Sequence, residues 1–201
     1  VANGNVVLGQ VTTTSSAINV TATTGSITEV TTLEGSTNEN LTGGVMTLTA
    51  STGIGATGGA GDIDTAATQL DLTTATGGIF IAETDGVQLG NATGGINTSA
   101  SGNIDIDAGG AITTGNTITT AGAGTINIDT SSGNITLSNT VTADTTGTVT
   151  INAAGALALG ANNVTGTGVS LSGTGVTSLA ASTVSGVSGD ILVDGNGGAI
   201  N

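Results

Sequence analysis

The stretch that decides the fold runs from residue 117 to residue 142 and reads TITTAGAGTINIDTSSGNITLSNTVT. Three short segments in it, residues 117–119, 126–128 and 135–137, alternate polar with aliphatic side chains, and residues 140–142 restart the series. An alternation of period two is typical of a β-strand that buries one face. Gly, Ser, Asn and Thr fill the spaces between the segments, and these residues favour turns.

This three-segment unit recurs along the chain. Its first segments begin at residues 117, 140, 163 and 183, which gives spacings of 23, 23 and 20 residues. Upstream, residues 69–71, 79–81 and 87–89 continue the phase. A fixed period of this size indicates a repeat architecture, and we expect roughly eight or nine coils of about 20–27 residues each.

The repeat predicts an all-β fold, a single-chain parallel β-helix (β-solenoid) with three short strands per coil. The segments are too short for a stable meander, and their connectors lack the usual two-residue hairpin turn. Stacked coils would bury the Ile, Val and Leu side chains in one column. We expect one continuous solenoid over residues 1–201, with irregular coils in 1–43, regular coils in 44–201 and a length of roughly 40 Å. The rival architecture is a β-sandwich, which usually has aromatic core residues and longer strands.

The composition excludes several function classes. The 201 residues include no Lys, Arg, His, Cys, Pro, Trp or Tyr, and 14 acidic residues give a formal charge of −14. Nucleic-acid binding and attraction to an anionic membrane both need Lys or Arg, and no apolar run is long enough to span a bilayer. Catalysis is not expected, because the usual bases and nucleophiles are missing except Asp, Glu, Ser and Thr.

Three segments carry a resemblance to a known family. Residues 102–112 (GNIDIDAGGAI), 133–138 (GNITLS) and 147–157 (GTVTINAAGAL) resemble the repeats of filamentous-haemagglutinin-like bacterial adhesins. The resemblance covers most of residues 44–201. It implies a right-handed parallel β-helix on a large secreted surface protein, hence an extracellular or cell-surface location. The absence of Lys and Arg agrees with this location, because trypsin-like proteases would find no cleavage site.

Acidic residues suggest one binding site. Asp105 and Asp107 alternate along one strand, and Asp129 occupies a matching place in the following coil. Stacked carboxylates could hold Ca²⁺, which takes six to eight oxygen ligands. Alternatively, these residues are solvated outward positions that keep the rod soluble. No other cofactor is expected.

A threonine pattern suggests a second site. Several threonines should stack at equivalent outward positions on successive coils: Thr117, Thr119, Thr140, Thr142, Thr165 and Thr183. Such an array resembles the surface of ice-binding solenoids. The pattern is missing at residues 69–71 and 95–97, and threonine is also a common residue on the exposed face of a strand.

These observations lead us to expect an extracellular structural or adhesive rod. It would be either a segment of a giant surface protein or a subunit of a filament built by end-to-end β-stacking. Neither end of the sequence has an obvious polar cap, so further coils or neighbouring copies are the expected partners, together with host or cell-surface glycans. The alternative is a ligand-binding solenoid for ice, Ca²⁺ or glycans.

Overall fold

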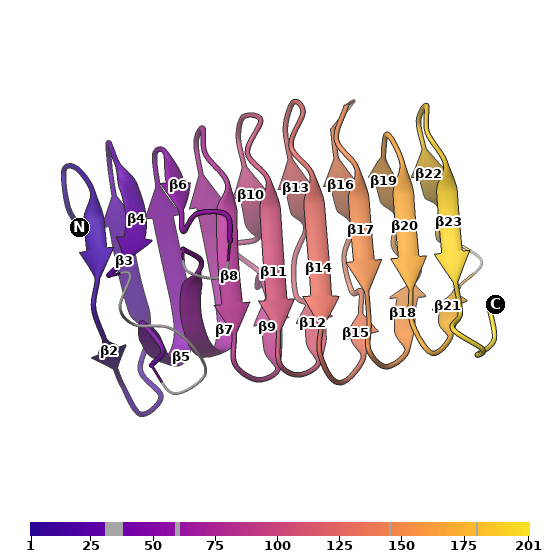
Figure 1. The fold of residues 1–201 in the computed structure, drawn as a ribbon, viewed down its shortest axis with the longest axis horizontal. Helices are drawn as coiled ribbons and strands as arrows, with labels where there is room; N and C mark the ends of the chain where they lie inside the picture. Colours follow the sequence, from indigo (N-terminus) through magenta and orange to yellow (C-terminus); the bar gives the residue numbers. More distant parts are fainter. Residues whose placement is uncertain (31–37, 59–60, 145, 180) are drawn as a thin grey trace.

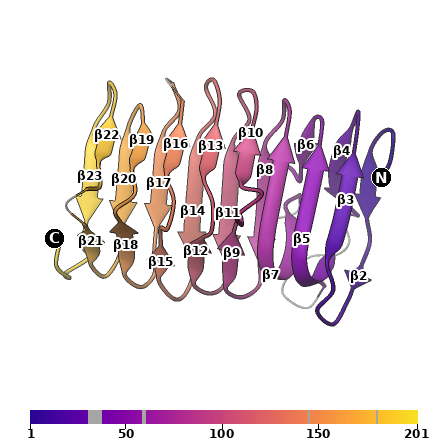
Figure 2. The ribbon, with the colours of Figure 1, turned by 180° about the vertical axis from the view of Figure 1, so that it is seen from behind.

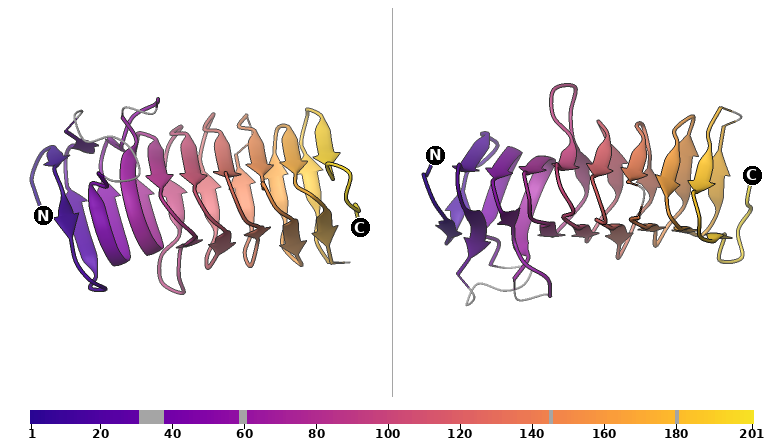
Figure 3. Two further views of the ribbon diagram at one scale, coloured as in Figure 1. Left: turned by 60° about the horizontal axis from the view of Figure 1, so that its bottom comes forward. Right: turned by 90° about the horizontal axis from the view of Figure 1, so that it is seen from above.

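The computed structural model describes residues 1–30, 38–58, 61–144, 146–179 and 181–201. They form a rod of stacked coils with the two chain ends at its opposite ends (Figures 1 and 3). The described elements are all β-strands in parallel pairing, which confirms the predicted β-solenoid. Within the described ranges, no helix could cross a membrane.

The register of the strands gives the size of each coil. One inward position recurs in every coil and pairs in sequence along the rod, at Val6, Ile27, Ile54, Ile79, Ile104, Ile126, Val149, Val169 and Ile191. The intervals between these residues run from 20 to 27 and number eight. The predicted coil length is therefore confirmed, and the rod has about eight turns.

Three parallel ladders run along the rod. The first ladder comprises β1 (Val6–Leu8), β4 (Ser26–Glu29), β6 (Gly53–Ile54), β8 (Ile79–Glu83), β11 (Ile104–Ala108), β14 (Ile126–Thr130), β17 (Val149–Asn152), β20 (Val169–Ser172) and β23 (Ile191–Asp194). The second ladder comprises β9 (Val87–Leu89), β12 (Ile112–Thr114), β15 (Ile135–Thr136), β18 (Leu157–Gly160) and β21 (Val176–Ser178). The third ladder, seen from behind in Figure 2, comprises β3 (Ile18–Ala22), β10 (Ile96–Thr98), β13 (Ile118–Thr120), β16 (Val141–Ala143), β19 (Val164–Gly166) and β22 (Val184–Gly186).

The N-terminal coils depart from three short strands per coil. β5 (Leu41–Ala50) and β7 (Ile63–Thr74) continue round the corners, and β7 pairs with a strand of each ladder in turn. β2 (Val11–Thr12) pairs with the start of β5. Gly43 and Ala67 are small residues at a corner. They are register partners in the pairing of β5 with β7, so both strands continue through the corner.

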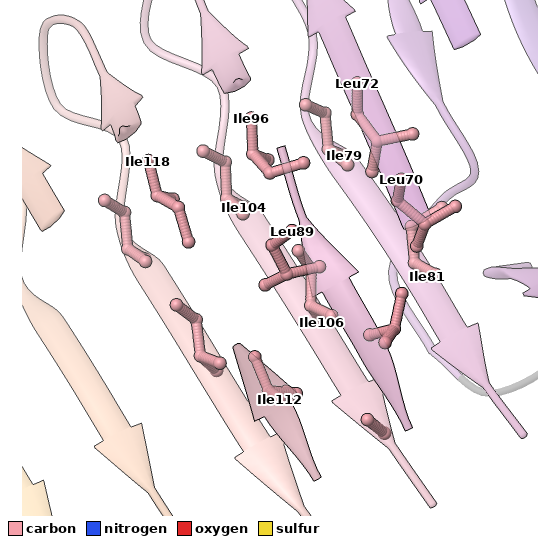
Figure 4. Packing of buried hydrophobic residues seen from close by; sticks show 14 of the residues in the cluster. Leu70, Leu72, Ile79, Ile81, Leu89, Ile96, Ile104, Ile106, Ile112 and Ile118 are labelled. Atoms are coloured by element: carbon pink, nitrogen blue, oxygen red, sulfur yellow. The ribbon is translucent and has the colours of Figure 1, made fainter. Parts of the chain in front are cut away.

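The core is one continuous apolar column inside the ladders. Figure 4 shows how Ile104 and Ile106 of β11 point into the same space as Leu89 and Ile112 from the second ladder. These four side chains are fully buried. Full burial of an aliphatic side chain contributes about 1.5–3 kcal/mol, so each inner coil adds a comparable amount to the stability of the rod.

Buried threonines close the corner between the third and first ladders. The Thr98 hydroxyl donates to the Gly102 carbonyl at 3.0 Å, and the Thr120 hydroxyl donates to the Gly124 carbonyl at 2.9 Å. Both side chains are buried, so these bonds satisfy groups that water cannot reach.

Asparagine explains the repeated Gly-Asn-Ile sequence. Asn103 and Asn134 each immediately precede a strand. The Asn103 side-chain oxygen accepts the Thr125 backbone N–H at 3.0 Å, and that of Asn134 accepts the Ala156 N–H at 2.9 Å. Each acceptor lies one coil before its donor, so the asparagine ties two consecutive corners together.

Glycine is required where the corners stack. A Cβ at Gly77 would lie 1.6 Å from the Thr52 carbonyl oxygen, whereas a Cβ at Gly9 would meet nothing within 4 Å. We therefore expect Gly77→Ala to lower the free energy of unfolding by about 1–3 kcal/mol, because the corner must shift to admit the methyl group. Chemical denaturation followed by circular dichroism measures this loss. Gly9→Ala is the control, and equal stability of the two variants would contradict the argument.

Candidate functional site

The predicted acidic residues lie on the outer side of the first ladder. Asp105 is the register partner of Phe80 on one side and Asn127 on the other, while Asp107 lies between Ala82 and Asp129. Asp105 and Asp107 line a cleft of about 120 Å³, which we call the acidic cleft, with Ala56, Gly58, Asp62, Phe80 and Ile81. The structure thus brings together residues from consecutive coils.

An amide group organises two of these carboxylates. The Asn127 side-chain NH₂ donates to Asp105 Oδ1 at 2.9 Å and to Asp129 Oδ2 at 2.6 Å. In a chain with no Lys, Arg or His, neutral amide donors replace salt-bridge partners. Asn127 therefore holds Asp105 and Asp129 in fixed positions.

Asp107 lies among several other carboxylates. Its pKa is raised to about 6 by partial loss of solvation and by the carboxylates of Asp105, Asp129 and Asp62. Crowded negative charge of this kind would be relieved by a cation. Nevertheless, the described residues contain no group of three acidic side chains arranged to hold a metal ion, so calcium binding stays a prediction.

The predicted threonines lie on the third ladder. Thr119, Thr142 and Thr165 are consecutive register partners, and Thr117, Thr140 and Thr183 each directly precede the strand of their coil. The column through Thr119 is longer than the sequence pattern indicated and runs through Thr21, Thr49, Thr73, Asn97, Thr119, Thr142, Thr165 and Ser185. We call this set the threonine column.

The sequence pattern does not show the upstream members of the threonine column if residues 69–71 are taken as the equivalent of residues 117–119. The register shows that Thr73, not Asp71, is the partner of Asn97. The alternation of Leu70, Asp71, Leu72 and Thr73 could have revealed this, because it continues two residues further.

The loop at residues 90–94 covers Asp71, which lies two residues before Thr73 of the threonine column. The Asn91 side-chain NH₂ donates to Asp71 Oδ2, and a Cβ at Gly94 would lie 3.2 Å from the Asp71 carboxyl carbon. Asp71 is consequently buried, and burial raises its pKa although Gln69 and Asn91 donate hydrogen bonds to it. The loop at residues 90–94 therefore interrupts the polar face of the third ladder.

Glu83 is an inward residue that the sequence analysis did not single out, and its place two residues after Ile81 is the one signal of its burial. It lies at the end of β8, where the alternation of Ile79 and Ile81 carries it into the core with 3 % of its surface exposed. Its carboxyl accepts the Thr65 hydroxyl at 2.6 Å and the Ala67 backbone N–H at 3.0 Å. Burial is the main cause that raises the pKa of Glu83 to about 7, against these two hydrogen bonds that lower it.

Comparisons with protein families, with characterised proteins and with solved structures find nothing that matches this chain. The β-solenoid is thus shown by the structure, while the adhesin resemblance rests on the repeat segments alone.

The buried carboxyl predicts a pH-dependent stability. Unfolded Glu83 ionises near pH 4.5, whereas the folded residue keeps its proton up to about pH 7. The contribution of Glu83 to the free energy of unfolding is therefore highest below pH 4.5. It falls by about 3 kcal/mol as the pH rises to 7. Glu83→Gln, which mimics the protonated form, should remove this fall and be the more stable protein at pH 8. Denaturant titrations at several pH values measure it.

Asp190→Asn serves as the control for that experiment, because Asp190 is exposed. It should leave the slope between pH 4.5 and 7 unchanged. A Glu83→Gln protein with the wild-type slope would show that another group causes it.

In the acidic cleft, the charge of one carboxylate should affect the pKa of another. Asp105→Asn should lower the pKa of Asp107 towards its ordinary value, because it removes the neighbouring charge that raises this pKa most while leaving the solvation of the cleft similar. Carboxyl carbon NMR shifts followed through a pH titration measure the change. Asp194→Asn, at the far end of the rod, should leave the Asp107 titration as it is; equal effects of both substitutions would contradict a local cause.

Proposed function

We propose that this chain is an extracellular structural and adhesive rod, of the kind found in filamentous-haemagglutinin-like surface proteins. The observation that carries the proposal is the unbroken stack of about eight coils with one apolar column inside. Such a body holds its ends a fixed distance apart and presents rows of side chains along its sides. Both are properties of a spacer or adhesive stalk.

The outward side chains support this role. Along the first ladder the outward residues are mainly polar, as at Asn127, Thr150 and Ser170. They keep the sides of the rod hydrated, while the carboxylates give copies a negative charge that opposes side-to-side clumping. Glycans at a cell surface, which are rich in hydroxyl groups, are a suitable adhesive partner for such polar rows.

The ends of the rod differ from its sides. Large hydrophobic residues are exposed at both end coils, for example Val7 in β1 and Leu192 in β23. A further coil stacked on either end, from this polypeptide or from another, would cover part of their surface and pair the open strand edge. Stacking of coils at the ends is therefore part of the proposed role.

Electron microscopy tests the proposal. Gold-labelled antibodies against the chain should mark the outside of the cells that produce it, and the purified chain should appear as rods at least roughly 40 Å long, from eight coils at about 4.8 Å each. Label confined to the cell interior, or globular particles, would overturn the proposal.

The threonine column favours a second candidate function, which is binding of an ordered surface such as ice. Its regular rungs reach from Thr21 to Ser185, further than the sequence indicated. The loop over Asp71 weakens this candidate, because a flat ligand would meet the loop before the centre of the face. Thermal hysteresis measurements decide between the two: we expect none. Hysteresis that Thr142→Tyr abolishes, and Thr150→Tyr on the first ladder does not, would favour ice binding instead.

A further inference from the structure

Several asparagines of the chain stand two residues before Ser or Thr, which is the acceptor triplet for N-linked sugars. There are six: Asn19, Asn40, Asn91, Asn97, Asn134 and Asn163. Because the chain is rich in Asn and Thr, some of these triplets are expected by chance. The contacts of the six side chains separate structural asparagines from the others.

Two of the six tie consecutive coils together. Asn163 directly precedes β19, and its side-chain oxygen accepts the Thr183 backbone N–H at 2.9 Å. Asn134 does the same for the Ala156 N–H in the following coil. The need to satisfy a backbone donor at the corner explains both asparagines without any sugar.

Two more have a contact that a folded rod needs. Asn40 is fully buried, and its side-chain oxygen accepts the Asp64 backbone N–H at 2.9 Å. Asn91 donates from its side-chain NH₂ to Asp71 and so holds the loop at residues 90–94 in place. A sugar on Asn40 would have no space, and the fold accounts for Asn91.

Asn97 has no such explanation. It lies in the middle of β10 with its side chain exposed, and it makes no side-chain hydrogen bond to any described residue. Every other rung of the threonine column is Thr or Ser, so Asn97 is the exception in its own column. Threonine favours strands, whereas asparagine is depleted in them. Neither contacts nor strand propensity therefore accounts for an asparagine at this rung.

Asn19 is the other exposed acceptor without a side-chain hydrogen bond in the described ranges. Its strand β3 pairs with one described strand, β5, whereas β10 lies between β7 and β13. The surroundings of Asn97 are thus defined on both sides, and we restrict the proposal to Asn97.

The surface beside Asn97 suits a polyhydroxylated group. Its register partner Thr73 and the third residue of its triplet, Ser99, both line a groove of about 340 Å³. The groove is formed by Thr, Ser and Ala residues and has no charged residue in its lining. Ligand sites in proteins commonly start at about this volume. A sugar attached to Asn97 would find hydroxyl groups to bond with and no carboxylate to displace.

We propose that Asn97 carries an N-linked sugar, with Ser99 as the hydroxyl residue that the transferase recognises. The donor is a sugar activated by a phosphate ester at its C1 carbon. Asn97 Nδ2 forms the new bond to C1 while the C1–O bond to the phosphate breaks. The phosphate leaves with the bonding electron pair, a base of the transferase takes one amide proton, and nothing is oxidised or reduced. The inference rests on the proposed extracellular function, because such triplets are modified in secreted proteins.

Mass spectrometry of the native chain tests Asn97 directly. Proteolysis after acidic residues cuts behind Asp85 and Asp105 and releases residues 86–105 as one peptide, which contains both Asn91 and Asn97. Asn91 is therefore an internal control with the same type of triplet and different contacts. Fragmentation that leaves the sugar attached should place it on Asn97 and not on Asn91. A bare Asn97 overturns the proposal, whatever the state of Asn91.

Variants made in the cells that produce the native chain test the role of Ser99. Ser99→Ala keeps Asn97 and should abolish its modification, whereas Ser99→Thr should retain it. Ser101→Ala is the matched control, because it removes an exposed hydroxyl just outside the triplet and should leave the sugar in place. Circular dichroism checks that all three variants fold. A sugar that persists on Asn97 in Ser99→Ala would contradict recognition through Ser99.

The failure of this inference can be told from failure of the proposed function. If Asn97 is bare while antibodies mark the chain as rods outside the cell, the proposed function stands and the modification fails. If Asn97 is bare and the label is confined to the cell interior, both fail.

A sugar on Asn97 would also affect which face of the rod meets a partner. It would cover the middle of the threonine column and leave the acidic cleft on the first ladder open.

Discussion

Parallel backbone pairing between successive coils is the constraint on which the rest of the structure depends. Because each coil pairs with the next at about 4.8 Å, a side chain meets the same position of its neighbours all along the rod. The inward column from Val6 to Ile191 must accordingly keep similar size, and it contains only Ile and Val. The corners obey the same rule with different chemistry. There Gly77 makes room for the Thr52 carbonyl, and Asn103 satisfies the N–H of Thr125 in the next coil.

The absence of cationic side chains gives the surface its particular electrostatics. Carboxylates in this chain take their hydrogen bonds from amides and hydroxyls instead, as Asp105 does from Asn127 and Glu83 does from Thr65. These neutral donors fix the position of a carboxylate without cancelling its charge. The raised pKa values of Asp107 and Glu83 have other causes: desolvation and neighbouring carboxylates in the first case, and burial in the second, where the hydrogen bonds act in the opposite direction.

The features that could be predicted from the sequence are those that repeat. The spacing of residues 117, 140 and 163 gave the coil length, and the alternation of Ile126, Asn127 and Ile128 gave the inward and outward faces. Features that occur once were not predictable in this way. Glu83 has the character of a turn residue beside Thr84 and Asp85, and only its place two residues after Ile81 reveals its burial. The loop over Asp71 depends on a contact between residues 20 apart in sequence that no periodicity encodes.

The coils differ in residue number, yet each occupies one level of the same ladders. Between Ile54 and Ile63, for example, the chain leaves the first ladder and returns to it, and both isoleucines remain fully buried and pair with β8 two residues apart. Extra residues therefore widen the molecule without lengthening it. In an evolving or engineered protein, the length of the rod then changes by duplication or loss of whole coils. An insertion where the chain leaves a ladder instead projects from the side of the rod. The length of the rod is therefore a whole number of coil heights, and a foreign peptide grafted between residues 55 and 62 should leave that length unchanged.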